Sequence, residues 1–408
     1  MSAQEPRTRW GGIADGSFRP SGFFRVEQSN GAFWLADPDG GRFLSKGVNT
    51  VRFDQDKIRN SKRVPYAETC RTKYGGEDAW RAAAATRLRA WGFNTLGSWS
   101  DEAVARAGPK PLAVTPNLDL GMSFAWEKND RSPGEPRQHF PDVFDPAFEA
   151  HVRGRARERC APHRGEANII GCFIDNELRW GPDWRGPEEL LPLFLQLSPA
   201  TPGRVAAQEF LHSRHGNNDP FDRADCDAFL GVLADRYFAL TTAAVRAADP
   251  DHLVLGSRFA LPPARSVIDA AAAYVDVISF NCYDSVPDVA LAAYAATGKP
   301  CLIGEFSFRA ADSGLPNTNG AGPKVATQAE RATAFRRYVT SALREPAIVG
   351  YHWFEHADQP AEGRFDGENS NFGTVTIEDR VYEELTHAMT AVNAEAERIH
   401  ASSGEAVA

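Results

Sequence analysis

The sequence predicts an α/β protein, a (β/α)8 TIM barrel with a small N-terminal β-hairpin and long loops at the C-terminal face of its strands. Three observations favour this fold. The chain has 408 residues, of which 42% are hydrophobic and 24% charged, so it can bury a large core. Eight short apolar segments alternate with segments of helical periodicity. This alternation is typical of a parallel barrel, and a doubly wound open sheet is the alternative.

The chain begins with a predicted hairpin. Residues 23–43 read FFRVEQSNGAFWLADPDGGRF, two alternating runs separated by Asn-Gly and followed by Asp-Gly-Gly. These dipeptides favour the tight turns of hairpins. We therefore expect residues 1–43 to form an N-terminal segment packed on the barrel, residues 44–398 to form the catalytic barrel, and residues 399–408 to form a flexible tail.

The eight barrel strands are expected in short segments rich in β-branched and aromatic residues. Several are almost continuously apolar, as strands buried on both faces are. The segments are 44–49, 93–99, 112–119, 168–177, 252–259, 275–283, 301–308 and 348–355.

Helices are expected between these strands, because apolar residues recur there at intervals of three and four. The clearest lie at 77–92, 227–250 and 328–346. Gly92 and Pro250 are expected to end the first two.

Charge and cysteine usage exclude several classes of partner. The chain has 54 acidic and 45 basic residues, a net charge of -9, which disfavours nucleic acid and anionic membranes. The first residues, MSAQEPRTRWGG, contain no apolar run of the signal-peptide type, so we expect a cytoplasmic protein. The six cysteines show no CxxC spacing and are interpreted as free thiols.

In a (β/α)8 barrel the chemistry takes place at the C-terminal ends of the strands. The predicted strand ends carry polar and aromatic residues that a purely structural barrel does not need. Long loops follow on the same side, at 50–77, 120–146, 178–205 and 356–373. The strand-end residues are Asn49, Trp99, Asp119, Asn176, Glu177, Arg258, Asn281, Tyr283, Glu305, His352, Trp353 and Glu355.

Two carboxylates stand out among them. Glu177 ends the fourth strand and Glu305 lies near the end of the seventh, so a barrel brings them to opposite sides of one mouth. A pair of carboxylates about 5 Å apart is the arrangement of a retaining glycosidase, in which one attacks the sugar and the other protonates the leaving oxygen. Either residue alone could be a solvated loop carboxylate, but two at buried strand ends favour catalysis.

Metals and cofactors are not expected. The sequence contains no HExxH, no HxH at the end of the first strand, and no glycine-rich phosphate loop. His212 and His215 are the only close histidine pair and are interpreted as solvated. The DGENSN run at 366–371 lacks the ligand spacing of a calcium loop.

The strand-end pattern resembles the clan A glycoside hydrolases, whose acid/base and nucleophile are glutamates that end strands four and seven. The resemblance implies that Glu177 is the acid/base and Glu305 the nucleophile. It also implies that Asn176 binds a sugar 2-hydroxyl, that Tyr283 touches the nucleophile, and that Trp353 forms the sugar platform.

Within this clan the chain is most similar to the exo-acting β-agarases of glycoside hydrolase family fifty. The resemblance spans most of residues 30–380. Those agarases usually carry a large N-terminal β-sandwich-like domain and are secreted, and we see neither feature in these 408 residues, so we expect short oligosaccharides rather than agarose as substrate. The similar stretches are FLSKGVNTVRF, WGFNTLGSWSD, FIDNELRWG, LGSRFA, IGEFSFRA, HWFEHADQP and GRFDGENSNFG.

Other residues near the strand ends suit sugar binding. Indole rings stack on the apolar face of a pyranose, and amides, carboxylates and guanidinium groups bind its hydroxyls. Any one of these side chains could instead be structural. The expected stacking residues are Trp99, Trp126, Trp180, Trp184 and Trp353, and the expected polar contacts are Asn49, Arg258, Asp358, Gln359 and Asn371.

The hypothesis from sequence is a retaining β-glycoside hydrolase, exo-acting on β-galactosyl or agarase-like linkages in oligosaccharides, with no cofactor. Burial should raise the pKa of Glu177, while Tyr283 or Arg258 keeps Glu305 ionised. A transglycosylase with the same mechanism and a non-catalytic carbohydrate-binding barrel remain alternatives. A metal-dependent amidohydrolase is disfavoured for want of ligands. Sugar identity, linkage and oligomeric state stay open.

Overall fold

The computed structural model describes residues 6–127, 140–216 and 221–405 and has a mixed α/β fold. At its centre lies a six-stranded, wholly parallel sheet of order β6-β5-β4-β13-β10-β9. Its strands are β4 (Ser45–Val48), β5 (Thr95–Leu96), β6 (Ala113–Val114), β9 (Ile278–Asn281), β10 (Cys301–Phe306) and β13 (Ile348–Trp353).

Two further strands, β7 (Gly171–Cys172) and β8 (Leu253–Val254), form a separate parallel pair. All eight strands thus lie in the predicted segments. The sheet assignment does not join them into one barrel. Isolated parallel bridges link the separate pair to both edges of the larger sheet, Val114↔Ile169 and Asn117↔Phe173 on one side and Phe259↔Phe280 on the other.

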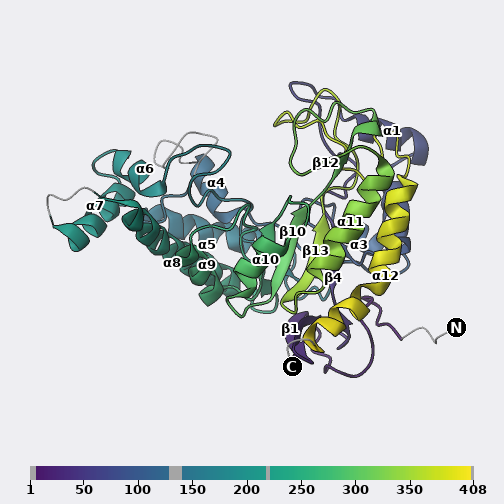
Figure 1. The fold of residues 1–408 in the computed structure, drawn as a ribbon, viewed down its shortest axis with the longest axis horizontal. Helices are drawn as coiled ribbons and strands as arrows, with labels where there is room; N and C mark the ends of the chain where they lie inside the picture. The colour runs from purple at the N-terminus through teal and green to yellow at the C-terminus, as the bar shows by residue number, and fades with distance from the viewer. Residues whose placement is uncertain (1–5, 128–139, 217–220, 406–408) are drawn as a thin grey trace.

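The helices surround this parallel core. In Figure 1, α4 to α9 extend to one side of the strands, and α1, α11 and α12 cover the other. They are α1 (Pro65–Tyr74), α2 (Glu77–Ala90), α3 (Val104–Ala107), α4 (Leu120–Glu127), α5 (Pro146–Cys160), α6 (Leu190–Gln196), α7 (Pro202–His215), α8 (Arg223–Ala248), α9 (Arg265–Tyr274), α10 (Asp288–Ala295), α11 (Gln328–Ala342) and α12 (Glu383–Glu405).

The three clearest helix predictions are confirmed as α2, α8 and α11. Helix α8 begins with a capping box in which Asp222 and Asp225 bond each other's backbone N–H, and it ends before Pro250. Gly92, with φ 80°, follows the end of α2. By length and composition alone α8 could cross a membrane, but 56% of its most apolar window is buried inside the protein.

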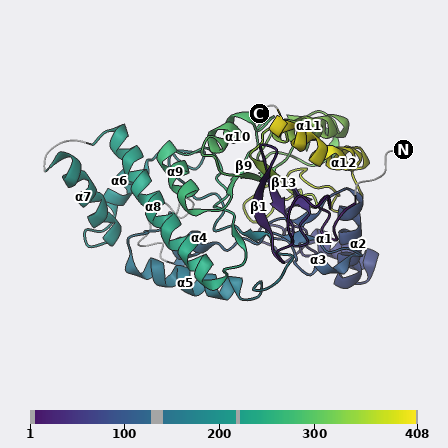
Figure 2. The same cartoon turned by 90° about the horizontal axis from the view of Figure 1, so that it is seen from below.

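The predicted N-terminal hairpin is also confirmed. Strands β1 (Arg25–Ser29) and β2 (Ala32–Ala36) pair antiparallel, and β3 (Arg42–Phe43) extends them. Leu35 and Phe43 are buried against Leu302 and Val349 of the central strands. Figure 2, seen from below, shows β1 lying across the strands. The hairpin therefore closes the core at one end.

The C-terminal prediction is wrong for most of its range. Residues 399–405 are not a flexible tail, because α12 continues to Glu405. His400 is fully buried there and its Nε2 lies 2.8 Å from the carbonyl oxygen of Phe33 in β2. One turn earlier, Glu397 accepts from Lys46 of β4 at 2.7 Å and forms an ion pair with Arg7 at 3.0 Å. Residues 406–408 lie outside the described residues.

The remaining described segments are short. Strand β11 (Arg309–Ala310) pairs with β12 (Lys324–Val325), and the 3-10 helix Ala311–Ser313 lies between them. Three of the predicted long loops contain helices, because α1, α4 and α6 begin within 50–77, 120–146 and 178–205. Residues 128–139 of the second loop lie outside the described residues.

Candidate active site

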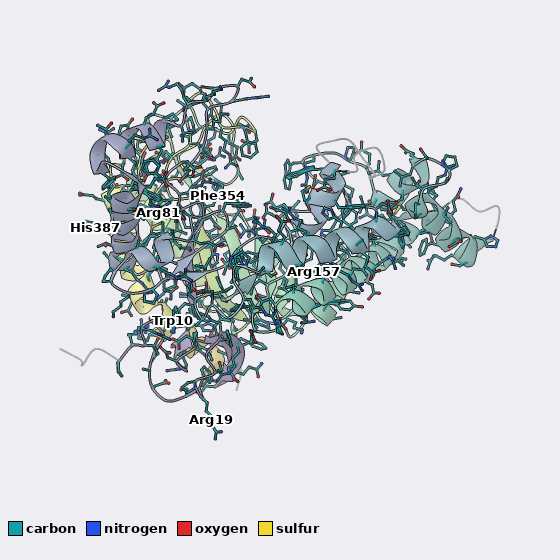
Figure 3. All side chains as sticks on the ribbon, turned by 180° about the vertical axis from the view of Figure 1, so that it is seen from behind. Trp10, Arg19, Arg81, Arg157, Phe354 and His387 are labelled. Carbon is teal, nitrogen blue, oxygen red and sulfur yellow. The ribbon has the colours of Figure 1, made fainter. Side chains whose placement is uncertain are left out.

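A cavity of about 940 Å³ opens at the C-terminal ends of the parallel strands. Its walls come from the segments that follow β4, β5, β7, β8, β9, β10 and β13, as a mouth at this end requires. In Figure 3, Phe354, which follows β13 and lines the cavity, is labelled between Arg81 of α2 and Arg157 of α5. The predicted site residues that line the cavity are Trp99, Asn176, Glu177, Trp184, Tyr283 and Glu305.

Glu177 lies just after β7 and faces this cavity. Its Oε1 accepts a hydrogen bond of 2.8 Å from the side-chain amide of Asn281, at the end of β9. Burial, followed by the negative charge of Glu305, raises the pKa of Glu177 from 4.5 to about 7. A carboxyl group with this pKa holds a proton near neutral pH and can give it to a leaving group.

Glu305 lies in β10 and is only 5% exposed. Its Oε2 accepts a hydrogen bond of 2.6 Å from the hydroxyl of Tyr283, and its Oε1 accepts one from Nη2 of Arg258. The expected contacts of Tyr283 and Arg258 with Glu305 are therefore present. These two charge-assisted hydrogen bonds hold both oxygens of the carboxylate in place, as a nucleophile in a fixed position requires.

Arg258 is fully buried behind the cavity wall and connects several strand ends. Besides Glu305 it donates to Asn176 Oδ1 at 2.7 Å and to Ser98 Oγ at 2.9 Å. Its guanidinium also lies 5.0 Å from the ring of Trp99. Arg258 therefore orients groups from three other strand ends, those of β5, β7 and β10. It does not line the cavity, so the prediction that it binds a sugar hydroxyl is corrected.

The two glutamates belong to one hydrogen-bonded chain. Asn281 donates to Glu177 and, at 3.2 Å, to Asn176 Oδ1, which also accepts from Arg258, the partner of Glu305. One end of this chain is a carboxyl group that holds a proton near neutral pH, and the other is a carboxylate paired with a cation. The arrangement can supply a general acid and a nucleophile to one bound molecule.

Residues in the left-handed region follow five successive parallel strands. Their φ values are 55° at Thr50, 61° at Trp99, 51° at Asp119, 54° at Glu177 and 49° at Arg258. A side chain other than glycine rarely adopts such a φ, and each instance costs about 1–3 kcal/mol in a strained setting. Three of these five residues, Thr50, Trp99 and Glu177, line the cavity.

The rim of the cavity has exposed aromatic residues on two sides. Trp184, in the loop after β7, is 64% exposed, and Phe365, in the loop after β13, is 76% exposed. Trp99 is 36% exposed at the wall between them. Such rings suit the apolar faces of sugars. Trp126, although exposed, is not among the cavity residues.

Two predicted tryptophans are instead core residues. Trp353 is fully buried among Phe306 and Phe335, and its Nε1 donates to the carbonyl oxygen of Phe372 at 2.9 Å. Trp180 is stacked on Phe238 with the ring planes 11° apart. Neither lines the cavity, so the prediction that they bind sugar is corrected, because both rings are buried among other side chains.

Asn49 is also structural. Its side-chain amide donates to the carbonyl oxygens of Gly304 at 2.9 Å and Trp353 at 3.1 Å, and the residue is fully buried. The predicted contact with a sugar hydroxyl is corrected, because the amide protons already join β4 to the neighbouring β10 and β13.

The three polar residues predicted after the eighth strand hold their own loop together. Asp358 accepts from Asn371 and from the hydroxyl of Tyr382, at 2.9 and 2.6 Å. Gln359 donates to Glu368 at 2.9 Å. All three predicted residues are buried and outside the cavity lining, so their role is corrected from sugar contact to loop support.

Sequence reasoning missed several cavity residues. Asn281 was noted only as a strand end, and no site residue was predicted in the segments from Thr50 to Lys57 and from Arg364 to Glu368. In the second segment Arg364 pairs with Glu368 at 2.7 Å and with Asp366 at 3.0 Å. The signals that could have found these segments are their overlap with the stretches similar to the agarases and their place in long loops after the strands.

Two buried carboxyl groups lie beside Arg364, Asp56 at 3.9 Å in the cavity lining and Glu355 at 4.0 Å outside it. Burial raises the pKa of Asp56 to about 6 and raises that of Glu355 well above 4.5. Within the described ranges, no group of three or more His, Cys, Asp or Glu residues could hold a metal ion.

The chain is similar to known proteins over most of its length. No protein-family model matches the chain. Two curated proteins of Vibrio sp. (strain JT0107) are similar, β-agarase B at 28% identity and β-agarase A at 29% identity. Each alignment covers 95% of this chain but only 50% and 48% of the relatives. The chain therefore spans about half the length of the curated relatives it matches.

The chain is also similar to solved structures of agarases. An exo-β-agarase superposes with a TM-score of 0.83 at 25% identity, covering 97% of this chain and 68% of that one. A second agarase superposes with a TM-score of 0.79 at 27% identity, covering 97% and 67%. The chain is therefore homologous to β-agarases and shares the mixed α/β fold of agarase structures, and these likenesses support a glycoside hydrolase.

Proposed function

We propose that the protein is a retaining, exo-acting β-glycoside hydrolase of the agarase type, which cleaves β-galactosyl or related linkages in oligosaccharides. The observation that carries the proposal is the linked pair in one cavity, Glu177 with a pKa of about 7 and Glu305 bonded to Arg258 and Tyr283. The curated relatives, named β-agarases, support the choice of linkage.

The reaction has two balanced steps. In the first, Glu305 attacks the anomeric carbon, the glycosidic C–O bond breaks, and Glu177 gives its proton to the departing oxygen. In the second, Glu177 takes a proton from water, the water oxygen attacks the anomeric carbon, and the bond to Glu305 breaks. Two inversions leave the anomeric configuration unchanged.

The fold proposed for this chemistry is a closed (β/α)8 barrel. The support is the set of parallel bridges Val114↔Ile169, Asn117↔Phe173 and Phe259↔Phe280, which connect the β7–β8 pair to both edges of the six-stranded sheet. The backbone bond from Ile174 N–H to the Gly256 carbonyl, 2.8 Å long, extends the β7–β8 pairing toward the mouth. Closure would bring the ends of β7 and β10 to one opening.

The test is hydrolysis of aryl β-glycosides and of short agaro-, galacto- and gluco-oligosaccharides by the wild type and the Glu305→Ala variant. We expect the wild type alone to release sugar, with the oligosaccharide cleaved identifying the linkage. Added azide should restore turnover to Glu305→Ala and give a glycosyl azide of inverted configuration, because azide enters from the face that the carboxylate vacated.

Two outcomes would contradict the proposal. A folded wild type that cleaves no member of the panel would be a binding protein rather than a hydrolase. A Glu305→Ala variant that keeps wild-type turnover would exclude Glu305 as the nucleophile. NMR of the first-formed product separates retention from inversion.

A further inference from the structure

A second groove of about 500 Å³ continues from the rim of the active-site cavity. The two hollows share Lys57 and Phe365, so a chain that leaves the cavity on this side enters the groove. The groove is lined by Lys57, Ile58, Arg59, Asn60, Ser61, Lys62 and Phe365.

The groove is cationic although the protein as a whole carries a net charge of -9. Three of its lining residues, Lys57, Arg59 and Lys62, are basic and exposed, and none of its lining residues is acidic. The basic residues that flank them are neutralised locally, Arg52 by Asp54 at 2.7 Å and Arg63 by Glu68 at 2.8 Å. The three groove cations have no such ion pair within the described part of the chain.

Among its described lining residues, the neighbouring cavity has no comparable group of unpaired cations. Its lining includes three basic residues, Arg52, Lys57 and Arg364, and Arg52 and Arg364 are paired with Asp54 and Glu368. Acidic side chains outnumber basic ones in that lining by seven to three. An anionic group on a ligand is therefore bound more favourably in the groove than beside the glutamates.

The groove is held in shape by backbone bonds. Ile58 N–H donates to the Arg63 carbonyl at 3.0 Å, which closes the loop that carries the cations. Arg59 N–H donates to the Gly363 carbonyl at 2.9 Å, which ties this loop to the segment after β13. At the junction the Phe365 ring has the Arg364 guanidinium 5.2 Å from its centre and is otherwise open to a sugar face.

We infer that this groove is a distal subsite that binds a sulfate ester or a carboxylate on a sugar unit remote from the cleaved bond. The inference rests on the proposed function, which supplies the saccharide. Phe365 stacks the connecting sugar, and Lys57, Arg59 and Lys62 bind the anion by charge-assisted hydrogen bonds. The preferred substrate is thus a β-linked oligosaccharide that is neutral at its reacting end and anionic beyond it.

The test compares oligosaccharides of equal length that are neutral, sulfated or uronate-bearing on the remote unit. The variant Arg59→Gln/Lys62→Gln removes the two groove cations that do not line the active-site cavity. A matched control, Arg19→Gln/Lys110→Gln, removes two exposed cations that line neither the cavity nor the groove. Figure 3 shows Arg19 projecting from the lower edge of the molecule, away from Phe354.

We expect the wild type and the control to prefer one or both anionic substrates by about tenfold in kcat/KM, as two or three partly exposed charge contacts allow. The groove variant should lose that preference and keep its rate on the neutral substrate. Salt should weaken the preference in the wild type and in the control. Comparison of the sulfated and uronate-bearing substrates identifies the anion recognised.

Equal rates on charged and neutral substrates, or a preference that survives in the groove variant, would overturn the inference. So would binding of inorganic sulfate as tight as that of the sulfated sugar, which would indicate a site for free anions. If the wild type cleaves nothing, the proposed function fails. Calorimetric titration with the same three sugars then still tests the groove by itself.

Discussion

The guanidinium of Arg258 donates to Oε1 of Glu305, and both groups are buried at the base of the active-site cavity. Because Arg258 also holds Asn176, it sets the position of residues that belong to both halves of the proposed reaction. Lysine keeps the charge but cannot make the three directed bonds. We expect Arg258→Lys to lower kcat by about 10- to 100-fold.

The same variant should leave substrate binding almost unchanged. Arg258 does not line the cavity, so KM should stay close to that of the wild type while kcat falls. Steady-state rates, with circular dichroism to check folding, measure both parameters. A folded Arg258→Lys variant with the kcat of the wild type would show that Arg258 does not position the catalytic pair.

Glu177 must be protonated to act as an acid, and its pKa is about 7. We therefore expect wild-type kcat/KM to fall as the pH rises through about 7. In Glu177→Gln this alkaline limb should vanish. The residual rate should depend strongly on the leaving group, and substrates with activated aryl groups should lose least. If the alkaline limb of kcat/KM persists in Glu177→Gln, an ionisable group other than Glu177 causes it.

The raised pKa of Glu177 also affects stability. Between pH 4.5 and 7 the folded protein keeps a proton that the unfolded chain has released, so this group lowers the free energy of unfolding as the pH rises. Glu177→Gln removes this decrease in the free energy of unfolding, because glutamine does not ionise. We expect its melting temperature to exceed that of the wild type by a few degrees at pH 8 and to match it near pH 4.5, measured by calorimetry.

Substitution of Trp353 should affect mainly stability, whereas substitution of Trp99 should affect mainly substrate binding. Trp353→Phe removes one of the two hydrogen bonds that the Phe372 carbonyl accepts, the other coming from Glu355 N–H at 3.2 Å. It should cost about 1 kcal/mol of stability, with little change in KM. Trp99→Ala removes a ring from the cavity wall and should raise KM about tenfold with a small change in melting temperature. A large KM effect for Trp353→Phe would restore the sugar-platform role that its burial argues against.

A substitution in the N-terminal hairpin should lower the stability of the protein and leave its catalytic activity unchanged. Leu35 is fully buried where the hairpin closes the core, away from the cavity. Leu35→Ala should cost about 2–5 kcal/mol in the free energy of unfolding, measured in urea, because it leaves a cavity between packed side chains. The rate per folded molecule should stay the same. Ala113→Gly, in the same cluster, is a milder control.

The order of strands and the two glutamates could be read from the sequence because both follow local rules. Buried parallel strands are short apolar runs, and a carboxylate directly after such a run is costly unless it has a function. Glu177 and Glu305 satisfy both conditions, and the structure places them in one cavity.

The remaining site residues depend on side-chain direction, which no local rule sets. Trp353 lies in the last position of β13 and points into the core, while the next residue, Phe354, lines the cavity. A shift of one residue along a strand reverses the face. Asp358, Gln359 and Asn371 bond within their own loop, and the sequence cannot distinguish such bonds from contacts with a ligand.

Glu397, near the end of α12, pairs with Arg7 and with Lys46, residues 390 and 351 positions earlier. During synthesis these contacts have to wait until almost the whole chain has left the ribosome. Contacts between such distant residues slow folding, and intermediates of large chains expose apolar surface. Nascent chains that stop before α12 should therefore be sensitive to protease and depend on chaperones. Docking of α12 should be the last step of folding.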